Sequence, residues 1–122
     1  MLDCIIIGGG MAGISAALTL KAQGREFMLL GAESSAKIRK AERILNYPAF
    51  TGGTGEELAK ILQNQLAEAG IELHGARAVG VYAGGGKITV QTSLDEWLEA
   101  KTVILATGAA AGSSVPGESE YT

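Results

Sequence analysis

The sequence has few of the residues that mark secreted, membrane-bound and nucleic-acid-binding proteins. It has one cysteine in 122 residues, which excludes an intrachain disulfide and a Cys-x-x-Cys redox pair within the sequence. Basic side chains (10) are fewer than acidic ones (13), and the net charge of −3 argues against nucleic acid or an anionic membrane as the main partner. No apolar run approaches the ~18 residues of a membrane-spanning helix. The N-terminus lacks the basic region of a signal peptide, because Asp3 is its first charged side chain. We therefore expect a cytoplasmic protein that binds neither nucleic acid nor membrane.

What the sequence does have is apolar residues and glycine. Hydrophobic residues make up 47% of the chain and charged residues 19%, which is typical of a globular protein. A chain of 122 residues suggests one domain that is long enough to bury a core.

The most informative stretch is a glycine motif between an apolar run and a helix of small residues. Residues 4–7 (Cys-Ile-Ile-Ile) are of strand type, and Gly8, Gly10 and Gly13 then form G-x-G-x-x-G. Gly8 would allow the sharp turn, Gly10 the close approach of a pyrophosphate, and Gly13 the packing of helix on sheet. The free N–H groups of such a helix start favour phosphate. The motif therefore predicts a dinucleotide site, because its strand and helix context is correct.

The glycine motif belongs to a β-α-β unit that departs from the usual fingerprint in one place. We expect a strand at 2–7, a helix from 11 or 12 to about 23, and a strand at 27–30. The acidic residue that bonds the ribose is expected at the end of the second strand, but Gly31 stands there. Either Glu33 reaches back to the ribose, or backbone around Gly31 replaces the carboxylate.

The rest of the chain predicts a long connection, a second helix and a return to the sheet. Residues 31–55 have little periodicity, and connections of this length are usually functional. Thr54 and Glu57 form a capping box before a helix that runs to about residue 69. Its predicted buried stripe consists of Leu58, Ile61, Leu62, Gln65 and Leu66.

After that helix we expect a short parallel strand and an antiparallel meander. The short strand covers residues 71–74, and alternating residues from 77 to 98 indicate three strands with turns at 84–86 and 93–96. Trp97 is interpreted as a packing residue of the meander. A separate apolar strand at 102–108 then returns to the parallel sheet. The expected fold is therefore α/β: a Rossmann-like parallel sheet with helices plus a three-stranded antiparallel meander.

The order of these parts resembles the FAD domain of thioredoxin reductase-like flavoproteins, in its N-terminal half. Four stretches carry the resemblance, and they extend over essentially all of the chain. They are Ile-Ile-Gly8-Gly-Gly10-Met-Ala-Gly13, Ile44-Leu45-Asn46-Tyr47-Pro48, the run from Gly52 to Leu58, and Val103-Ile-Leu-Ala106-Thr107-Gly108. The stretches 30–31 and 35–41 look more like members that lack ordinary NADPH use, including ferredoxin- or flavin-linked reductases.

The resemblance implies FAD as cofactor and assigns the residues around it. The pyrophosphate would be held by Gly8, Gly10, Met11, Ala12 and Gly13. Gly31 or Glu33 would serve the ribose, Lys37 and Ile38 would line the cofactor, Asn46 would lie near the flavin, and Ala78 near the adenine. Ala106, Thr107 and Gly108 would pack against the cofactor from the other side. No side chain is a convincing acid, base or nucleophile, no metal site is expected, and His74 is interpreted as structural.

The resemblance also implies what the chain would need for catalysis. In the family a nucleotide-binding domain with Cys-x-x-Cys follows, whereas Cys4 lies within a strand and is interpreted as a core residue. We therefore expect residues 1–112 to form an FAD-binding half-domain and 113–122 a linker, in a fragment or split subunit that is not catalytically complete alone. A homodimer or a partner chain would complete the flavin domain. Two alternatives stay open: an NAD(P)-binding dehydrogenase domain, and a non-catalytic dinucleotide-binding or interaction module.

Overall fold

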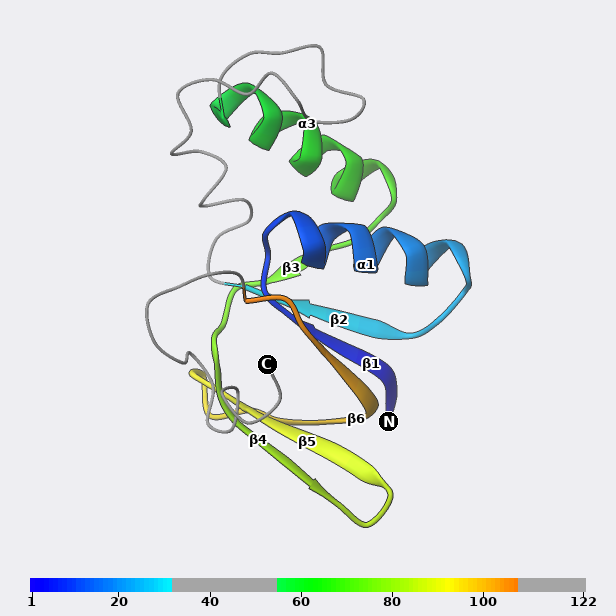
Figure 1. The fold of residues 1–122 in the computed structure, drawn as a ribbon, viewed down its shortest axis with the longest axis vertical. Helices are drawn as coiled ribbons and strands as arrows, with labels where there is room; N and C mark the ends of the chain where they lie inside the picture. The colour runs from blue at the N-terminus through cyan, green and yellow to red at the C-terminus, as the bar shows by residue number, and fades with distance from the viewer. Residues whose placement is uncertain (32–54, 108–122) are drawn as a thin grey trace.

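The computed structural model describes residues 1–31 and 55–107 (Figure 1). Its elements are β1 (Leu2–Ile7), α1 (Met11–Ala22), β2 (Phe27–Leu30), α3 (Gly55–Glu68), β3 (Leu73–His74), β4 (Ala78–Gly84), β5 (Lys87–Thr92) and β6 (Trp97–Leu105). The predicted capping box at Thr54, the long connection and the proposed linker at 113–122 lie outside the described residues.

The strands form one sheet with the order β3-β2-β1-β6-β5-β4. The pairs β3–β2, β2–β1 and β1–β6 are parallel, whereas β6–β5 and β5–β4 are antiparallel. This arrangement confirms the predicted α/β class, with a parallel half and an antiparallel meander.

Strand β6 serves both halves of this sheet, which differs from the prediction of two separate strands. It is nine residues long. Its first part pairs with β5 as far as Ala100, and Ala100 also begins the pairing with β1, opposite Leu2. Ala100 is completely buried at this exchange of partners. The polar residues Glu99 and Lys101 interrupt the apolar pattern on either side of it, so the sequence looked like two strands.

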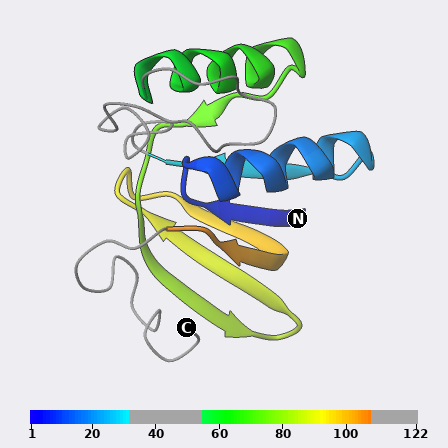
Figure 2. The same cartoon turned by 45° about the horizontal axis from the view of Figure 1, so that its top comes forward.

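Both described helices lie on one side of the parallel strands, and the meander lies on the other side (Figures 1 and 2). Two apolar clusters, one on each side of the parallel strands, hold these three layers together. Strand β1 contributes to both clusters, because its residues alternate between the faces. Cys4 and Ile6 pack towards the helices, and Ile5 and Ile7 towards the meander. The helix-side cluster also contains Ile14, Ala17, Leu29, Leu58, Leu62, Leu66 and Ile71. The meander-side cluster also contains Leu30, Ala78, Val90 and Ala100. Cys4 is thus a core residue, as predicted.

The second described helix, α3, buries a slightly different stripe from the predicted one. Leu58, Leu62 and Leu66 are buried, whereas Ile61 is 45% exposed and Gln65 is also exposed. Ala59 is completely buried in place of Ile61. The buried stripe of α3 is therefore shifted from the predicted one towards Ala59.

The predicted turns of the meander are present. Gly85 and Gly86 have φ of +63° and +77° and connect β4 to β5 as a two-residue hairpin. The second turn is closed by the Thr92 N–H, which donates to the Glu96 carbonyl at 2.9 Å. Trp97 is 60% exposed and stacks on Tyr82, with 6.0 Å between ring centroids. Within residues 1–31 and 55–107, no helix has the length and apolar character needed to cross a membrane.

Candidate functional site

The glycine loop Gly8–Gly10 lies at the carboxyl end of β1, between the ends of two neighbouring strands. The Gly8 N–H donates to the Leu30 carbonyl at the end of β2, at 2.8 Å. On the other side the Ala106 N–H, just after β6, donates to the Ile7 carbonyl at 2.8 Å. The loop is therefore fixed on both sides by backbone hydrogen bonds.

Two glycines of the motif are required by contacts between backbone segments. Gly8 has φ of +123°, and a Cβ there would lie 2.0 Å from the Ala106 carbonyl oxygen. A Cβ on Gly13 would lie 1.8 Å from the Gly8 carbonyl oxygen. Both values are far below any normal contact, so neither position accepts a side chain without a backbone shift. These contacts bring the start of α1 directly onto the loop.

The third glycine of the motif, Gly10, faces open space. Among the described residues, a Cβ at this position would have no neighbour within 4 Å, and Gly10 caps α1 without a side-chain hydrogen bond. The first intrahelical bond runs from the Ile14 N–H to the Gly10 carbonyl, at 3.0 Å. The N–H groups of Met11, Ala12 and Gly13 thus have no acceptor within the helix. No acidic residue lies in the first turn of α1, so this helix start can attract an anion.

Gly31 explains the departure from the dinucleotide fingerprint. A Cβ on Gly31 would lie 2.9 Å from the Gly9 nitrogen and 3.1 Å from the Gly9 Cα. The carboxylate expected at this position would therefore push against the glycine loop. The Gly31 N–H donates to the His74 carbonyl at 3.1 Å, which ties the end of β2 to β3. Close approach of backbone thus takes the place of an acidic side chain.

The topology places the glycine loop where α/β proteins bind nucleotides. From β1 the chain moves through α1 to β2 and then β3 on one side, and it later returns to β6 on the other side of β1. Such a change of direction leaves a crevice at the carboxyl ends of the strands, where ligands bind in open α/β sheets. The loop lies at this switch point between β1 and β6.

The other predicted site residues divide into three groups. Ala106 and Thr107 follow β6 beside the loop and are half-buried. Ala78 begins β4 and is buried in the meander-side cluster. The remaining predicted positions lie outside the described residues: Glu33, Lys37, Ile38, Asn46 and Gly108.

A polar network near the loop was not found from the sequence. His74 Nε2 lies 2.7 Å from Glu96 Oε1, and the Thr92 hydroxyl donates to the same oxygen at 2.8 Å. Hydrogen bonds from His74 and then from Thr92 lower the pKa of Glu96 below its ordinary value. Histidine and glutamate are 22 residues apart, so no local motif links them. The one signal in the sequence was a single histidine at a strand end.

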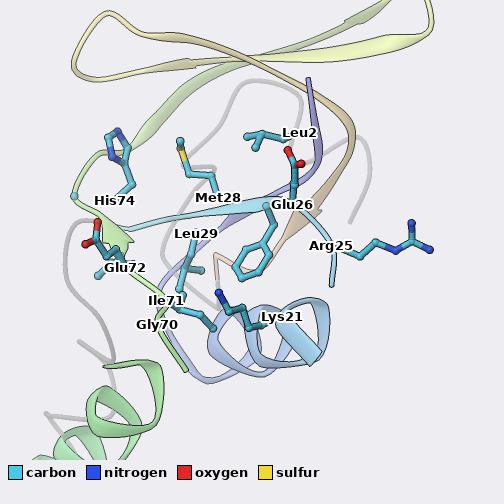
Figure 3. Close-up of a pocket in the computed structure, with 13 residues that line it drawn as sticks. Leu2, Lys21, Arg25, Glu26, Met28, Leu29, Gly70, Ile71, Glu72 and His74 are labelled. Atoms are coloured by element: carbon cyan, nitrogen blue, oxygen red, sulfur yellow. The ribbon is translucent and has the colours of Figure 1, made fainter. Parts of the chain in front are cut away.

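A pocket of about 640 Å³ lies away from the glycine loop, towards the amino end of β2. Figure 3 shows Met28 and His74 on the side turned away from α1, with Lys21 on that helix. The lining includes Lys21 and Arg25 but also Glu26 and Glu72, so charge favours neither anions nor cations. This pocket does not include any residue of the glycine motif.

Comparison with known proteins agrees with the geometry of the loop. The model of the pyridine nucleotide-disulphide oxidoreductase family matches residues 2–122. The chain belongs to this family. The family consists of FAD flavoproteins, and the close-packed glycine loop, the open Gly10 and the acid-free helix start all fit a dinucleotide pyrophosphate. The predicted family, fold class and cofactor are confirmed.

Several curated relatives in the family are reductases. A thioredoxin reductase of Aquifex aeolicus is 32% identical over 122 residues, covering 98% of this chain and 38% of the relative. One of Peptoclostridium acidaminophilum is 37% identical, covering 98% and 39%. A ferredoxin–NADP reductase of Ignicoccus hospitalis is 31% identical, covering 88% and 37%.

Solved structures extend the same likeness. A ferredoxin-flavin thioredoxin reductase of Clostridium acetobutylicum has a TM-score of 0.86 at 28% identity, covering 92% of this chain and 39% of that one. The thioredoxin reductase of Lactococcus lactis has a TM-score of 0.84 at 29% identity, covering 99% and 40%. The chain thus spans less than half the length of the relatives that it matches, consistent with part of an FAD-binding domain.

Proposed function

We propose that this chain binds FAD at the glycine loop and is the FAD-binding portion of a thioredoxin reductase-like oxidoreductase. The observation that carries the proposal is the combination of Gly10, where an added Cβ would meet no described atom within 4 Å, with Gly8 and Gly13, which are packed against backbone. A loop built only as a turn has no need to leave one glycine uncovered at a helix start. The named relatives support a reductase of the thioredoxin or ferredoxin type.

The chain's own residues would bind and orient the cofactor. Gly10 would let the backbone approach the pyrophosphate, and the N–H groups of Met11, Ala12 and Gly13 would face its oxygens. Backbone around Gly31 would meet the adenosine ribose in place of the usual carboxylate. When FAD is bound, its isoalloxazine ring supplies the redox chemistry.

Ala106 and Thr107 would border the cofactor from the β6 side. Among the predicted positions beyond the described residues, Glu33, Lys37, Ile38, Asn46 and Gly108 remain proposed contacts, as does Ala78 near the adenine. The sequence holds only Cys4, so a dithiol would have to come from a further segment or chain. We therefore propose residues 1–112 as the flavin-binding unit, with 113–122 as the linker to such a segment.

The direct test is titration of the purified chain with FAD, followed by flavin fluorescence and calorimetry. We expect saturable binding with quenching of the flavin, and competition by ADP. NADH serves as the comparison ligand, because a dehydrogenase domain would bind it in preference to FAD. Absence of FAD binding together with tight NADH binding would replace the proposal with the dehydrogenase alternative. Absence of both would favour a non-catalytic interaction module.

The unpaired edge of β6 supports a second proposal, that the flavin domain is completed by association. Among residues 1–31 and 55–107, β5 pairs with β6 only as far as Ala100, so residues 101–105 have β1 on one side and no strand on the other. Ile104 on this part is 37% exposed. Open strand edges favour pairing with another chain.

We therefore propose a homodimer or a partner chain. The test is light scattering of the chain at several concentrations. A monomer throughout would contradict the homodimer. We also propose a cytoplasmic location, supported by the similarity to thioredoxin reductases, and cell fractionation with an antibody against the chain would test it.

A further inference from the structure

The network around Glu96 connects two distant parts of the sheet. Glu96 belongs to the turn between β5 and β6, whereas His74 ends β3 at the opposite edge of the sheet. Glu96 Oε1 accepts hydrogen bonds from His74 Nε2 at 2.7 Å and from the Thr92 hydroxyl at 2.8 Å. The side chains of His74 and Glu96 are 32% and 34% exposed. This contact therefore crosses from the meander to the parallel half of the sheet.

The hydroxyl of Thr92 holds the Glu96 side chain in place. It is 1% exposed and is the buried polar residue within the described part of the chain. Its hydroxyl oxygen also accepts from the N–H groups of Leu94 and Glu96, at 3.2 and 3.3 Å. The turn is tied in addition to the segment after β3, because the Ser93 N–H donates to the Arg77 carbonyl at 2.8 Å. The carboxylate of Glu96 is thus held in place before it meets the imidazole.

The backbone of His74 continues this chain of contacts to the nucleotide loop. Its carbonyl accepts the N–H of Gly31 at 3.1 Å and the N–H of Ala76 at 2.8 Å. Gly31 in turn packs on Gly9, where an added Cβ would lie 2.9 Å from the Gly9 nitrogen. Movement of His74 would therefore be transmitted to Gly31 and from there to the loop.

We infer that His74 and Glu96 are positioning residues, which hold Gly31 against the glycine loop and thereby shape the β2 side of the nucleotide site. That side receives the adenosine ribose in dinucleotide-binding folds. The chain places glycine where a carboxylate would bond the ribose, so the position of the backbone matters more here. The identity of the ligand in this inference rests on the proposed function. The effect of the pair on Gly31 does not, because it follows from the contacts of Gly31.

Charged residues flank the network in the sequence, and the variants are confined to the two residues of the pair. Glu72 precedes β3 and lines the same pocket as His74, Arg77 follows β3, and Asp95 lies in the turn with Glu96. Glu96→Gln removes the charge but keeps an oxygen that accepts from both His74 and Thr92. Glu96→Ala removes that oxygen, and His74→Ala breaks the contact from the other end. Glu99→Gln is the matched control, because Glu99 is a glutamate three residues further along the chain, on β6, and pairs with Lys87.

The experiment measures amide hydrogen exchange by NMR in the full chain together with FAD affinity. In Glu96→Ala and His74→Ala we expect exchange at Gly31 to rise about tenfold, the effect of losing one hydrogen bond. Ala106, whose N–H is bonded to the Ile7 carbonyl on the β6 side of the loop, should change less than about twofold, because neither residue belongs to β2 or β3. FAD affinity should fall in parallel with the loss of protection at Gly31. Glu96→Gln should restore both values, and Glu99→Gln should leave both unchanged.

Unchanged exchange at Gly31 in both alanine variants would overturn the inference. Equal rises at Gly31 and Ala106 would also overturn it, since they would indicate general loosening of the sheet. Increased exchange at Gly31 with unaltered FAD affinity would overturn the link to the nucleotide site. If the unmodified chain does not bind FAD, the proposed function fails, and the exchange data still decide whether the pair positions Gly31.

Discussion

Alanine at Gly13 and alanine at Gly10 should separate the folding role of the glycine motif from its binding role. At Gly13 the added Cβ would lie 1.8 Å from the Gly8 carbonyl oxygen, about 1.6 Å short of an ordinary contact. Overpacking of this kind costs about 1–3 kcal/mol, and a backbone atom cannot swing away as a side chain does. Alanine's better helix propensity, about 1 kcal/mol, offsets part of this cost. A clash with backbone belongs at the upper end of the overpacking range, about 3 kcal/mol, and less about 1 kcal/mol for propensity we expect Gly13→Ala to destabilise the chain by about 2 kcal/mol.

Gly10→Ala is the matched control for stability. Gly10 has φ of −85° and ψ of −163°, which any residue adopts, and its Cβ would meet nothing within 4 Å. The expected cost is at most about 1 kcal/mol, from the poorer capping by alanine. FAD binding should nevertheless weaken at least about tenfold, or ~1.4 kcal/mol, because the methyl group occupies the approach of the pyrophosphate.

Calorimetric melting and urea unfolding of the three proteins, without ligand, give the first measurement. A loss of 2 kcal/mol corresponds to a fall in melting temperature of roughly 6–10 °C for a domain of this size. The FAD titration on the same samples gives the second. If Gly13→Ala has the same melting temperature as Gly10→Ala, the close packing of α1 on the loop is refuted. If Gly10→Ala binds FAD as well as the unmodified chain, the pyrophosphate does not lie at Gly10.

Three further predictions concern other parts of the fold. Gly31→Asp, which installs the acid of the usual fingerprint, should weaken FAD binding in titration because its Cβ would press on the Gly9 nitrogen; tighter binding would contradict this. Gly85→Asn should raise the free energy of unfolding by about 0.5 kcal/mol in urea, since asparagine suits the left-handed Gly85–Gly86 turn. Hydrogen bonds from His74 hold the pKa of Glu96 down. Its contribution to stability is present above a glutamate's ordinary pKa of about 4.3 and is lost as the pH falls through the lower folded value. Melting temperatures from pH 7 to pH 3 should therefore fall less steeply in Glu96→Gln, and identical slopes would contradict this origin.

The sequence predicted those parts of the fold that depend on local pattern. The apolar run of β1, the glycine motif and the small residues of α1 occur within about 20 residues, and each requires its own local geometry. The Gly85–Gly86 hairpin was predicted for the same reason, because two glycines between alternating strands favour one turn type. These features need no knowledge of distant contacts.

The parts that escaped prediction depend on residues that are distant in the chain. Ile61 has the right spacing for a buried face of α3, but it is 45% exposed and Ala59 is completely buried instead. The continuity of β6 is determined by Ala100, which pairs with Leu2 and Ile88 at once. Position 31 requires glycine because the backbone of Gly9, in the glycine loop, packs directly against it. The pairing of His74 with Glu96 can be predicted only when it is known that the sheet brings the end of β3 close to the turn between β5 and β6.

The position of β6 beside β1 also governs when the protein can fold during its synthesis. Leu2 pairs with Ala100 and Ile7 with Leu105, so β1 leaves the ribosome well before the strand with which it pairs. At 5–20 residues per second this delay lasts between about 5 and 20 s. Ile5 and Ile6, completely buried in the finished fold, lack one neighbouring strand for all of that time. The apolar side chains of β1 are therefore open to non-native contacts until β6 has been made.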